Sequence, residues 1–272
     1  MNYLFLFLVL IIFLLIFLIY LFFSYKTKNK NNNNNYLPIR FYIISLRNTS
    51  IERKLNIQTI YKKLPNVKIV EAIDGSQLTK EDLEKFVSNK ALIPPFQDQY
   101  INGRPILVNQ FACLLSHKKA LDLAAKELKP NECAVIIEDD AFILDGFLNI
   151  IKEIKLRFDS NGDDLVNLCV YDHDASIRDA SIRDALIRDA SIKDALIPTP
   201  KGLWGTACYM TTAGAFRNNL IPMRGALDEQ LTNMPGLKSR TYIGDPIVKL
   251  LDVPSDITGN PRTILGVLSG QN

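Results

Sequence analysis

Two patterns of apolar positions alternate along residues 37–272. Short continuous apolar runs predict buried strands at residues 41–46, 67–70, 133–137, 165–171 and 207–210. Apolar residues at helical spacing predict helices over residues 109–127 and 147–158 and after Thr212, and Thr79 with Asp82 opens a short helix. Thr49 and Glu52, at the spacing of a capping box, predict a helix after the first strand. The alternation predicts an α/β domain with a mostly parallel sheet and helices on both faces.

The N-terminal segment has a different pattern. Residues 3–23 are apolar without interruption, which is long enough to span a bilayer. No basic residue precedes the run and no small-residue cleavage site follows it, so a permanent anchor is favoured over a cleaved signal peptide. We therefore predict a single-pass anchor at residues 1–25, a disordered Lys/Asn-rich tether at 26–36 and a globular domain at 37–272.

The orientation of this anchor has two solutions. Lys26, Lys28 and Lys30 follow the span, and the positive-inside rule then keeps the domain on the cytoplasmic face. Enzymes of the secretory pathway with the same layout face the lumen of the endomembrane system instead. Both orientations stay open.

Net charge and cysteine placement disfavour several classes of protein. A net charge of +3 is too small to indicate nucleic-acid binding. The four cysteines are scattered within apolar segments, which favours buried thiols over a disulfide framework or a zinc site.

One segment breaks the strand and helix pattern. Residues 174–197 repeat a five-residue unit, DASIR or a close variant, five times. The unit resembles that of pentapeptide-repeat solenoids, but five copies make only about one coil, which cannot bury its faces alone. We interpret the segment as a duplication that lengthened a surface loop.

The strongest chemical signal stands at the end of the strand predicted over residues 133–137. Three consecutive carboxylates follow it: Glu138, Asp139 and Asp140. Ligands bind beyond the carboxyl ends of parallel strands, and packed acids need a counter-charge. A divalent metal carrying a phosphorylated ligand would supply that charge, because hard cations take carboxylate oxygens. The alternative is an acidic turn that faces solvent.

Five other polar side chains bear on the site, and Arg47, Asp74 and Asp228 are the candidates among them. Arg47 follows the first strand, where it is placed for a phosphate or a base, whereas Arg53 is expected to pair at the surface. Asp74 lies in a tight turn and would contact a ribose or cap the turn. Asp228 would be an N-cap or a general base. His117, alone on a predicted helix, is expected to be structural.

Taken in chain order, eight segments of the domain resemble one known family. They are residues 43–47 (IISLR), 52–53 (ER), 71–75 (EAIDG), 112–121 (ACLLSHKKAL), 137–141 (IEDDA), 205–215 (GTACYMTTAGA), 227–228 (LD) and 254–257 (PSDI). The series is similar to glycosyltransferase family 25, which includes bacterial lipooligosaccharide galactosyltransferases and collagen hydroxylysine galactosyltransferases. One departure is Ala112, where the family has a glycine before the cysteine.

The resemblance implies a GT-A type fold with a D-x-D-like metal site at residues 138–140. Asp140 would be the principal ligand of Mn²⁺ or Mg²⁺, and Glu138 would support the metal or the ribose. The donor would be a UDP-sugar, with galactose or glucose expected. Arg47 and Asp74 would lie near the nucleotide, and Asp228 would be the base of an inverting reaction.

The resemblance does not define the acceptor substrate as narrowly as the donor. It would be a glycan or a hydroxylysine of a collagen-like protein, and the repeat at residues 174–197 interrupts the region that shapes acceptor sites. The alternative function is a membrane-tethered binding module that keeps the fold without activity.

Overall fold

The computed structural model describes residues 39–88, 107–169, 196–198, 205–212, 236–242 and 247–251 and the single residues 17, 227, 262, 267 and 270. The chain divides into two compact units, Met1–Pro38 and Ile39–Asn272. All strands and helices named below belong to the second unit.

The described elements follow the predicted order closely. The strands are β1 (Ile39–Ser45), β2 (Val67–Glu71), β3 (Cys133–Glu138), β4 (Ala141–Ile143), β5 (Leu165–Asn167), β6 (Leu196–Pro198), β7 (Cys208–Thr212), β8 (Ser239–Tyr242) and β9 (Val248–Leu250). The helices are α2 (Ile51–Lys63), the 3₁₀ turn η2 (Gly75–Gln77), α3 (Lys80–Ser88), α4 (Val108–Glu127) and α5 (Phe147–Asn161).

The main sheet is mixed. Its seven described strands lie in the order β2-β1-β3-β7-β5-β8-β6, and β4 pairs with β9 in a separate ribbon. Strands β1, β2 and β3 pair in parallel, and β5 pairs in parallel with β8, whereas β7 and β6 run in the opposite direction. The prediction of an α/β domain is confirmed, and five of the seven strands share one direction, but the reversed strand β7 between β3 and β5 was not predicted.

Side-chain alternation along β1 assigns the helices to the two faces of the sheet. Tyr42 and Ile44 belong to the apolar cluster built around α4. Phe41, the residue before Tyr42, packs its ring against Phe147 of α5, with centroids 6.4 Å apart. Because successive side chains of a strand point to opposite faces, α4 covers one face and α5 the other.

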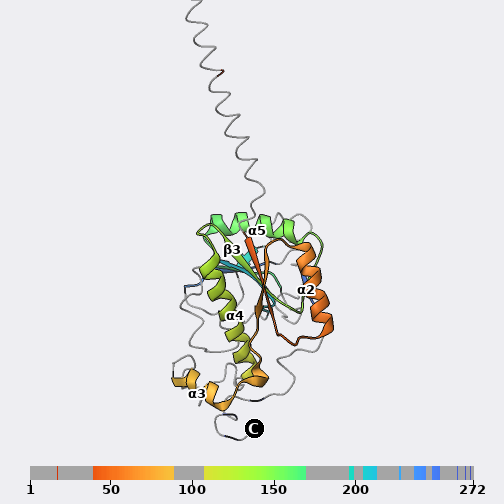
Figure 1. The fold of residues 1–272 in the computed structure, drawn as a ribbon. Helices are drawn as coiled ribbons and strands as arrows, with labels where there is room; N and C mark the ends of the chain where they lie inside the picture. The colour runs from red at the N-terminus through yellow and green to blue at the C-terminus, as the bar shows by residue number, and fades with distance from the viewer. Residues whose placement is uncertain are drawn as a thin grey trace, which may run out of the picture. The chain divides into compact units, whose positions relative to one another are not determined.

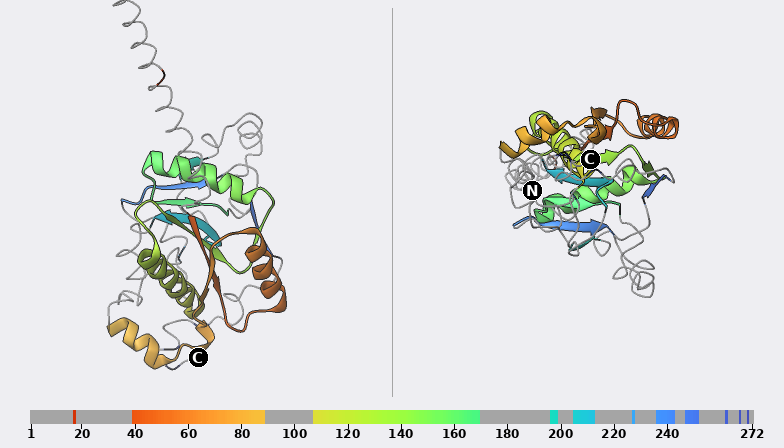
Figure 2. Two further views of the ribbon diagram at one scale, coloured as in Figure 1. Left: turned by 45° about the horizontal axis from the view of Figure 1, so that its top comes forward. Right: turned by 90° about the horizontal axis from the view of Figure 1, so that it is seen from below.

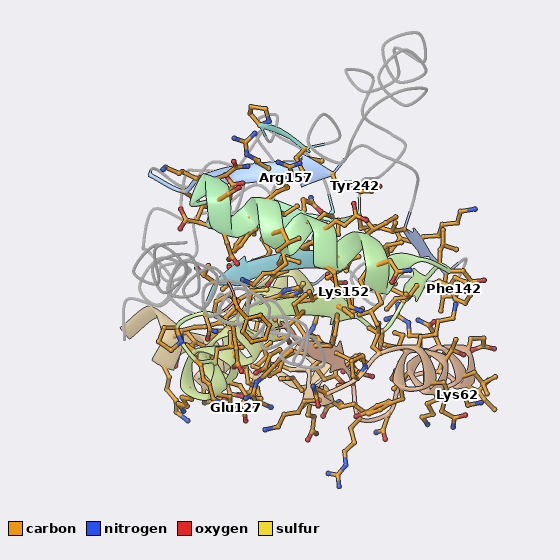
Figure 3. The ribbon with its side chains drawn as sticks, turned by 90° about the horizontal axis from the view of Figure 1, so that it is seen from above. Lys62, Glu127, Phe142, Lys152, Arg157 and Tyr242 are labelled. Carbon is orange, nitrogen blue, oxygen red and sulfur yellow. The ribbon has the colours of Figure 1, made fainter. Side chains whose placement is uncertain are left out.

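The three-dimensional arrangement agrees with this assignment. Figure 1 shows α4 and α2 on either side of the central strands, with α5 across the top of the view. Figure 2 shows α3 beyond the end of α4 at which that helix begins, where Phe86 of α3 meets Phe111 of α4 edge to face at 5.1 Å. At the other end of α4, Glu127 (Figure 3) accepts a hydrogen bond from the Tyr42 hydroxyl.

Two predicted boundaries are wrong for local reasons. The N-cap of α2 is Ser50, whose hydroxyl accepts from the Arg53 amide, and not Thr49. The strand predicted over residues 165–171 stops at Asn167, because the Asn167 side chain accepts from the Cys169 amide and turns the chain.

Several predictions fall outside the described residues. They include the helix after Thr212, most of the repeat, and the anchor at residues 3–23 apart from Phe17. Leu196 and Ile197, the last two residues of the repeat, form part of the edge strand β6 and are not in a loop. No helix within the described residues is both long and apolar enough to cross a membrane.

The cap of α2 provides a test of the fold. We predict that Ser50→Ala lowers the free energy of unfolding by about 1 kcal/mol, whereas Ser50→Gly lowers it by only a few tenths, because glycine is tolerated at an N-cap. Urea unfolding measures both. Equal and negligible effects would show that another residue caps the helix.

Candidate functional site

The candidate site is a pocket at the carboxyl ends of three neighbouring parallel strands, β2, β1 and β3. It has a volume of about 650 Å³, including the space at its open mouth. Its walls come from the three strand ends, from the turn before η2 and from the first half of α4. All three predicted acids, Glu138, Asp139 and Asp140, line it.

The pleat of β3 sends the first two acids to different helices. Ala134 and Ile136 face α4, so Glu138 does too, and its carboxylate reaches His117 of α4 at 3.2 Å. Asp139 faces the other side, where it contacts Arg53 of α2. The strand end is therefore held from both faces of the sheet.

Glu138 lies in a network of hydrogen bonds. Its Oε1 lies within hydrogen-bond distance of His117 Nε2, and it accepts from the Thr206 hydroxyl at 3.3 Å. His117 Nδ1 lies 3.0 Å from the Tyr209 hydroxyl, and the two rings stack. Burial acts to raise the pKa of Glu138, but the hydrogen bond and charge of His117 outweigh it, so the pKa lies below its ordinary value. Glu138 is therefore ionised at neutral pH.

Asp139 is a structural anchor whose two oxygens are both used. Oδ2 accepts from the hydroxyls of Ser45 at 2.6 Å and Thr49 at 3.0 Å, and Oδ1 accepts from Arg53. The Asp139 side chain is only 4% exposed. This carboxylate ties the ends of β1 and β3 to α2 and is not available to a ligand.

Asp140 is the acid that remains open. Its Oδ2 accepts from Arg53 at 3.0 Å, whereas its buried Oδ1 has no hydrogen-bond partner among the described residues. Burial, and then the charge of Glu138, raise the pKa of Asp140 to about 7, against the opposing charge of Arg53. A buried oxygen without a partner is costly, and a cation at this position would satisfy it.

The backbone of the acidic turn is held as firmly as its side chains. The Asn56 amide donates to the carbonyls of Asp139 at 2.9 Å and Ala141 at 3.0 Å. The Asp140 carbonyl accepts from the Leu251 amide at 2.8 Å. Because Arg53 and Asn56 are three residues apart, they project from the same face of α2 and grip the turn together.

The prediction for Arg53 is wrong. It is buried and pairs with two carboxylates of the site, whereas a pairing at the surface was expected. A signal was present in the sequence, because Arg53 and Asn56 share a helical stripe with the buried Ile57 and Ile60. Polar residues on the apolar stripe of a helix must find polar partners in the interior.

The other predicted residues have mixed outcomes. Arg47 is exposed in the β1–α2 turn, and Arg53 is the arginine that lines the pocket. Asp74 lines the pocket and caps η2, accepting from the Ser76 amide and hydroxyl. Asp228 lies outside the described residues. His117 was expected to be structural. Its ring is buried, but it also lies within hydrogen-bond distance of Glu138 inside the pocket.

One wall of the pocket depends on a close approach between the turn at η2 and the first half of α4. A Cβ at Gly75 would lie 2.3 Å from the Asn109 side-chain oxygen and 2.9 Å from the Asn109 Cα, so only glycine fits. The Ser116 hydroxyl accepts from the Ile73 amide and donates to the Ala112 carbonyl. These contacts fix the turn before η2 against α4.

Comparison with known proteins decides the family. The family model described as glycosyltransferase family 25 (LPS biosynthesis protein) matches residues 39–220, more than half of the chain. The chain belongs to glycosyltransferase family 25. The predicted resemblance is confirmed.

The curated relatives of this family 25 chain are longer proteins. Procollagen galactosyltransferase 2 of Mus musculus is 33% identical over 103 residues, covering 36% of this chain and 15% of that protein. Procollagen galactosyltransferase 1 of Danio rerio is 26% identical over 119 residues, covering 42% and 19%. The chain therefore matches less than a fifth of the length of either relative.

Among solved structures, the apo form of mouse xyloside xylosyltransferase 1 aligns over 87% of this chain and 71% of its own. The sequence identity is 13% and the TM-score is 0.27. That likeness is too low to establish a shared fold.

The acid cluster of this family 25 domain fits a divalent cation. Asp139 and Asp140 share one guanidinium, that of Arg53, and the ionised Glu138 adds a further negative charge to the pocket. The ionised Glu138 and the buried Oδ1 of Asp140 offer hard oxygen ligands of the kind that Mn²⁺ and Mg²⁺ take.

Removing the guanidinium tests the electrostatic account of the site. We predict that Arg53→Gln lowers the free energy of unfolding by about 3 kcal/mol, because it leaves buried carboxylates unpaired. The control Lys54→Gln changes an exposed charge on the next residue of α2 and is expected to stay within about 0.5 kcal/mol of wild type. Urea unfolding measures both, and similar losses in the two variants would contradict the account.

The raised pKa of Asp140 makes stability depend on pH. Between its ordinary value of about 4 and about 7, the folded protein holds a proton that the unfolded chain releases. In EDTA, the free energy of unfolding of wild type minus that of Asp140→Asn is therefore expected to fall from about pH 5 to about pH 7, by at most about 1.4 kcal/mol per pH unit. A difference that is constant or rises over this range would show that Asp140 is ionised throughout.

Proposed function

We propose that this family 25 domain is a metal-assisted, inverting hexosyltransferase of GT-A type that uses a UDP-sugar. The observation that carries the proposal is the buried Oδ1 of Asp140, which has no hydrogen-bond partner in the described part of the chain and lies in a pocket at the carboxyl ends of parallel strands. Such strand ends are where α/β proteins bind nucleotides. Family membership supports a sugar donor and an acceptor.

Asp140 and Glu138 would hold Mn²⁺ or Mg²⁺ beside the donor diphosphate. The ion would neutralise the charge that builds on the UDP leaving group. The residues around these ligands position them. Arg53 fixes one oxygen of Asp140, which leaves Oδ1 as the oxygen for the ion. His117 and Thr206 hold Glu138 in its ionised form.

The turn before η2 is the proposed nucleoside side of the pocket. Asp74 keeps its role as the candidate for the ribose, and both of its hydrogen bonds to Ser76 use Oδ1, so Oδ2 is the oxygen we assign to the sugar hydroxyls. Arg47 keeps its assignment near the nucleotide only if the bound diphosphate extends to the exposed β1–α2 turn. Arg53, which lines the pocket, is better placed to face the phosphates.

Asp228 is the proposed general base for the acceptor hydroxyl. Its chain neighbour Leu227 is buried in the apolar cluster around α4, the helix that walls the pocket. The relatives are named procollagen galactosyltransferases, which favours galactose as the sugar and a collagen-like acceptor. A glycan acceptor is the alternative, and the anchor at residues 3–23 would hold the domain at a membrane.

The central prediction compares two aspartates close in sequence. We expect Asp140→Asn to lower Mn²⁺-dependent hydrolysis of UDP-galactose or UDP-glucose at least about a hundredfold, because it removes the charged metal ligand. Asp145→Asn, an exposed acid whose side chain is 99% accessible, is expected to retain wild-type turnover. The assay uses the purified full chain, with circular dichroism to confirm folding.

Two results would overturn the proposal. Wild-type turnover in Asp140→Asn would remove the metal assignment. Absence of turnover in the wild-type chain with every UDP-sugar tested, together with no UDP-induced shift in melting temperature, would favour a binding module that keeps the fold without activity.

A further inference from the structure

A second set of metal-binding side chains lies in the same pocket, beside the acids already described. Cys113 Sγ, a ring nitrogen of His117 and a carboxylate oxygen of Glu138 all lie within 4.8 Å of one another. All three residues line the pocket. Cys113 is only partly buried, unlike Cys133, Cys169 and Cys208.

Two elements bring these ligands together. Cys113 and His117 are four residues apart on α4 and so project from the same helix face, one turn from each other. Glu138, at the end of β3, faces α4 because of the strand alternation. The site is thus formed by a helix and a strand that the core packs together, and not by a mobile loop.

The spacing suits a tetrahedral ion. With zinc bonds of about 2.0–2.3 Å, neighbouring ligand atoms lie about 3.3–3.6 Å apart. The distance from His117 Nε2 to Glu138 Oε1 is 3.2 Å, close to one edge of that tetrahedron. The ligand atoms lie up to 4.8 Å apart, so the Cys113 thiol would need to move closer by up to about 1.2–1.5 Å, which a change of side-chain torsion can supply.

The surroundings of the imidazole also fit a ligand. His117 Nδ1 lies 3.0 Å from the Tyr209 hydroxyl, and burial holds the pKa of Tyr209 well above its usual range. Nδ1–H can donate to this hydroxyl, and Zn²⁺ would replace the Nε2 proton that donates to Glu138 in the metal-free site. Metal-bound histidines usually have such a partner on the other ring nitrogen.

We propose that Cys113, His117 and Glu138 form a zinc site, with water in the fourth position, distinct from the Mn²⁺ or Mg²⁺ site at Asp140. Thiolate and imidazole favour Zn²⁺, whereas the oxygen ligands of Asp140 favour harder ions. The two sites share Glu138, so Zn²⁺ at the first withdraws a ligand from the second and inhibits sugar transfer. The binding claim is independent of the proposed function, and the inhibition claim rests on it.

Metal binding to the purified full chain tests the site without any turnover. Co²⁺ is expected to give a thiolate charge-transfer absorption band in wild type, and Zn²⁺ to abolish it. Cys113→Ala is expected to lose the band and to raise the Kd for Zn²⁺ at least about tenfold. Cys133→Ala, which alters a buried thiol on the opposite face of the sheet, is expected to match wild type.

The inhibition claim has its own measurement. Zn²⁺ is expected to inhibit Mn²⁺-dependent UDP-sugar hydrolysis in wild type, at a concentration at least about tenfold lower than in Cys113→Ala. Equal inhibition of both proteins, or none of either, would overturn the shared role of Glu138.

The two proposals fail differently. A Co²⁺ spectrum without a thiolate band, or a Zn²⁺ affinity unchanged in Cys113→Ala, would overturn the zinc site even if the chain transfers sugar. Cys113-dependent Zn²⁺ binding by a chain that turns over no UDP-sugar would uphold the zinc site and remove the enzymatic function.

Discussion

The guanidinium of Arg53 makes the acidic end of β3 possible. Three consecutive carboxylates at a mostly buried strand end would repel one another, and burial alone would drive them to bind protons. Arg53 pairs with Asp139 and Asp140 together, and its own side chain is only 8% exposed. The neutralisation is incomplete, because Arg53 pairs with Asp139 and Asp140 while Glu138 lies on the other side of the strand end, beside His117. The remaining negative charge is what makes the pocket suited to a cation.

The same ion pair divides the work of the three acids. Both carboxylate oxygens of Asp139 accept hydrogen bonds, from Ser45 at the end of β1, from Thr49 in the β1–α2 turn and from Arg53. Asp139 therefore stabilises the fold and is not available to a ligand. Asp140 accepts a hydrogen bond from Arg53 through Oδ2, whereas its buried Oδ1 has no hydrogen-bond partner among the described residues. Glu138 points to the opposite face, where the hydrogen bond and charge of His117 lower its pKa. The three consecutive acids at the end of β3 therefore have different roles. Asp139 is a structural anchor, Asp140 is a metal ligand, and Glu138 is a ligand that the two proposed metal sites share.

Much of this could be predicted from the sequence, and the exceptions have physical causes. Continuous apolar runs located β1, β2, β3 and β7, and the acids at the end of β3 indicated the site, because these signals are local. The reversal of β7 depends on pairing between distant strands, which no local pattern encodes. Arg53 looked like a surface residue because its partners lie 86 and 87 positions away. The grouping of Cys113 with Glu138 likewise exists only once α4 packs on the sheet.

The central claim is that Asp140 binds a divalent ion together with a nucleotide. Its most direct test is the electron paramagnetic resonance signal of free Mn²⁺, followed as the full chain is added with and without UDP. The account predicts one Mn²⁺ bound per chain, tighter with UDP, and loss of that binding in Asp140→Asn but not in Asp145→Asn. Mn²⁺ binding that UDP does not change, or that survives in Asp140→Asn, would contradict it.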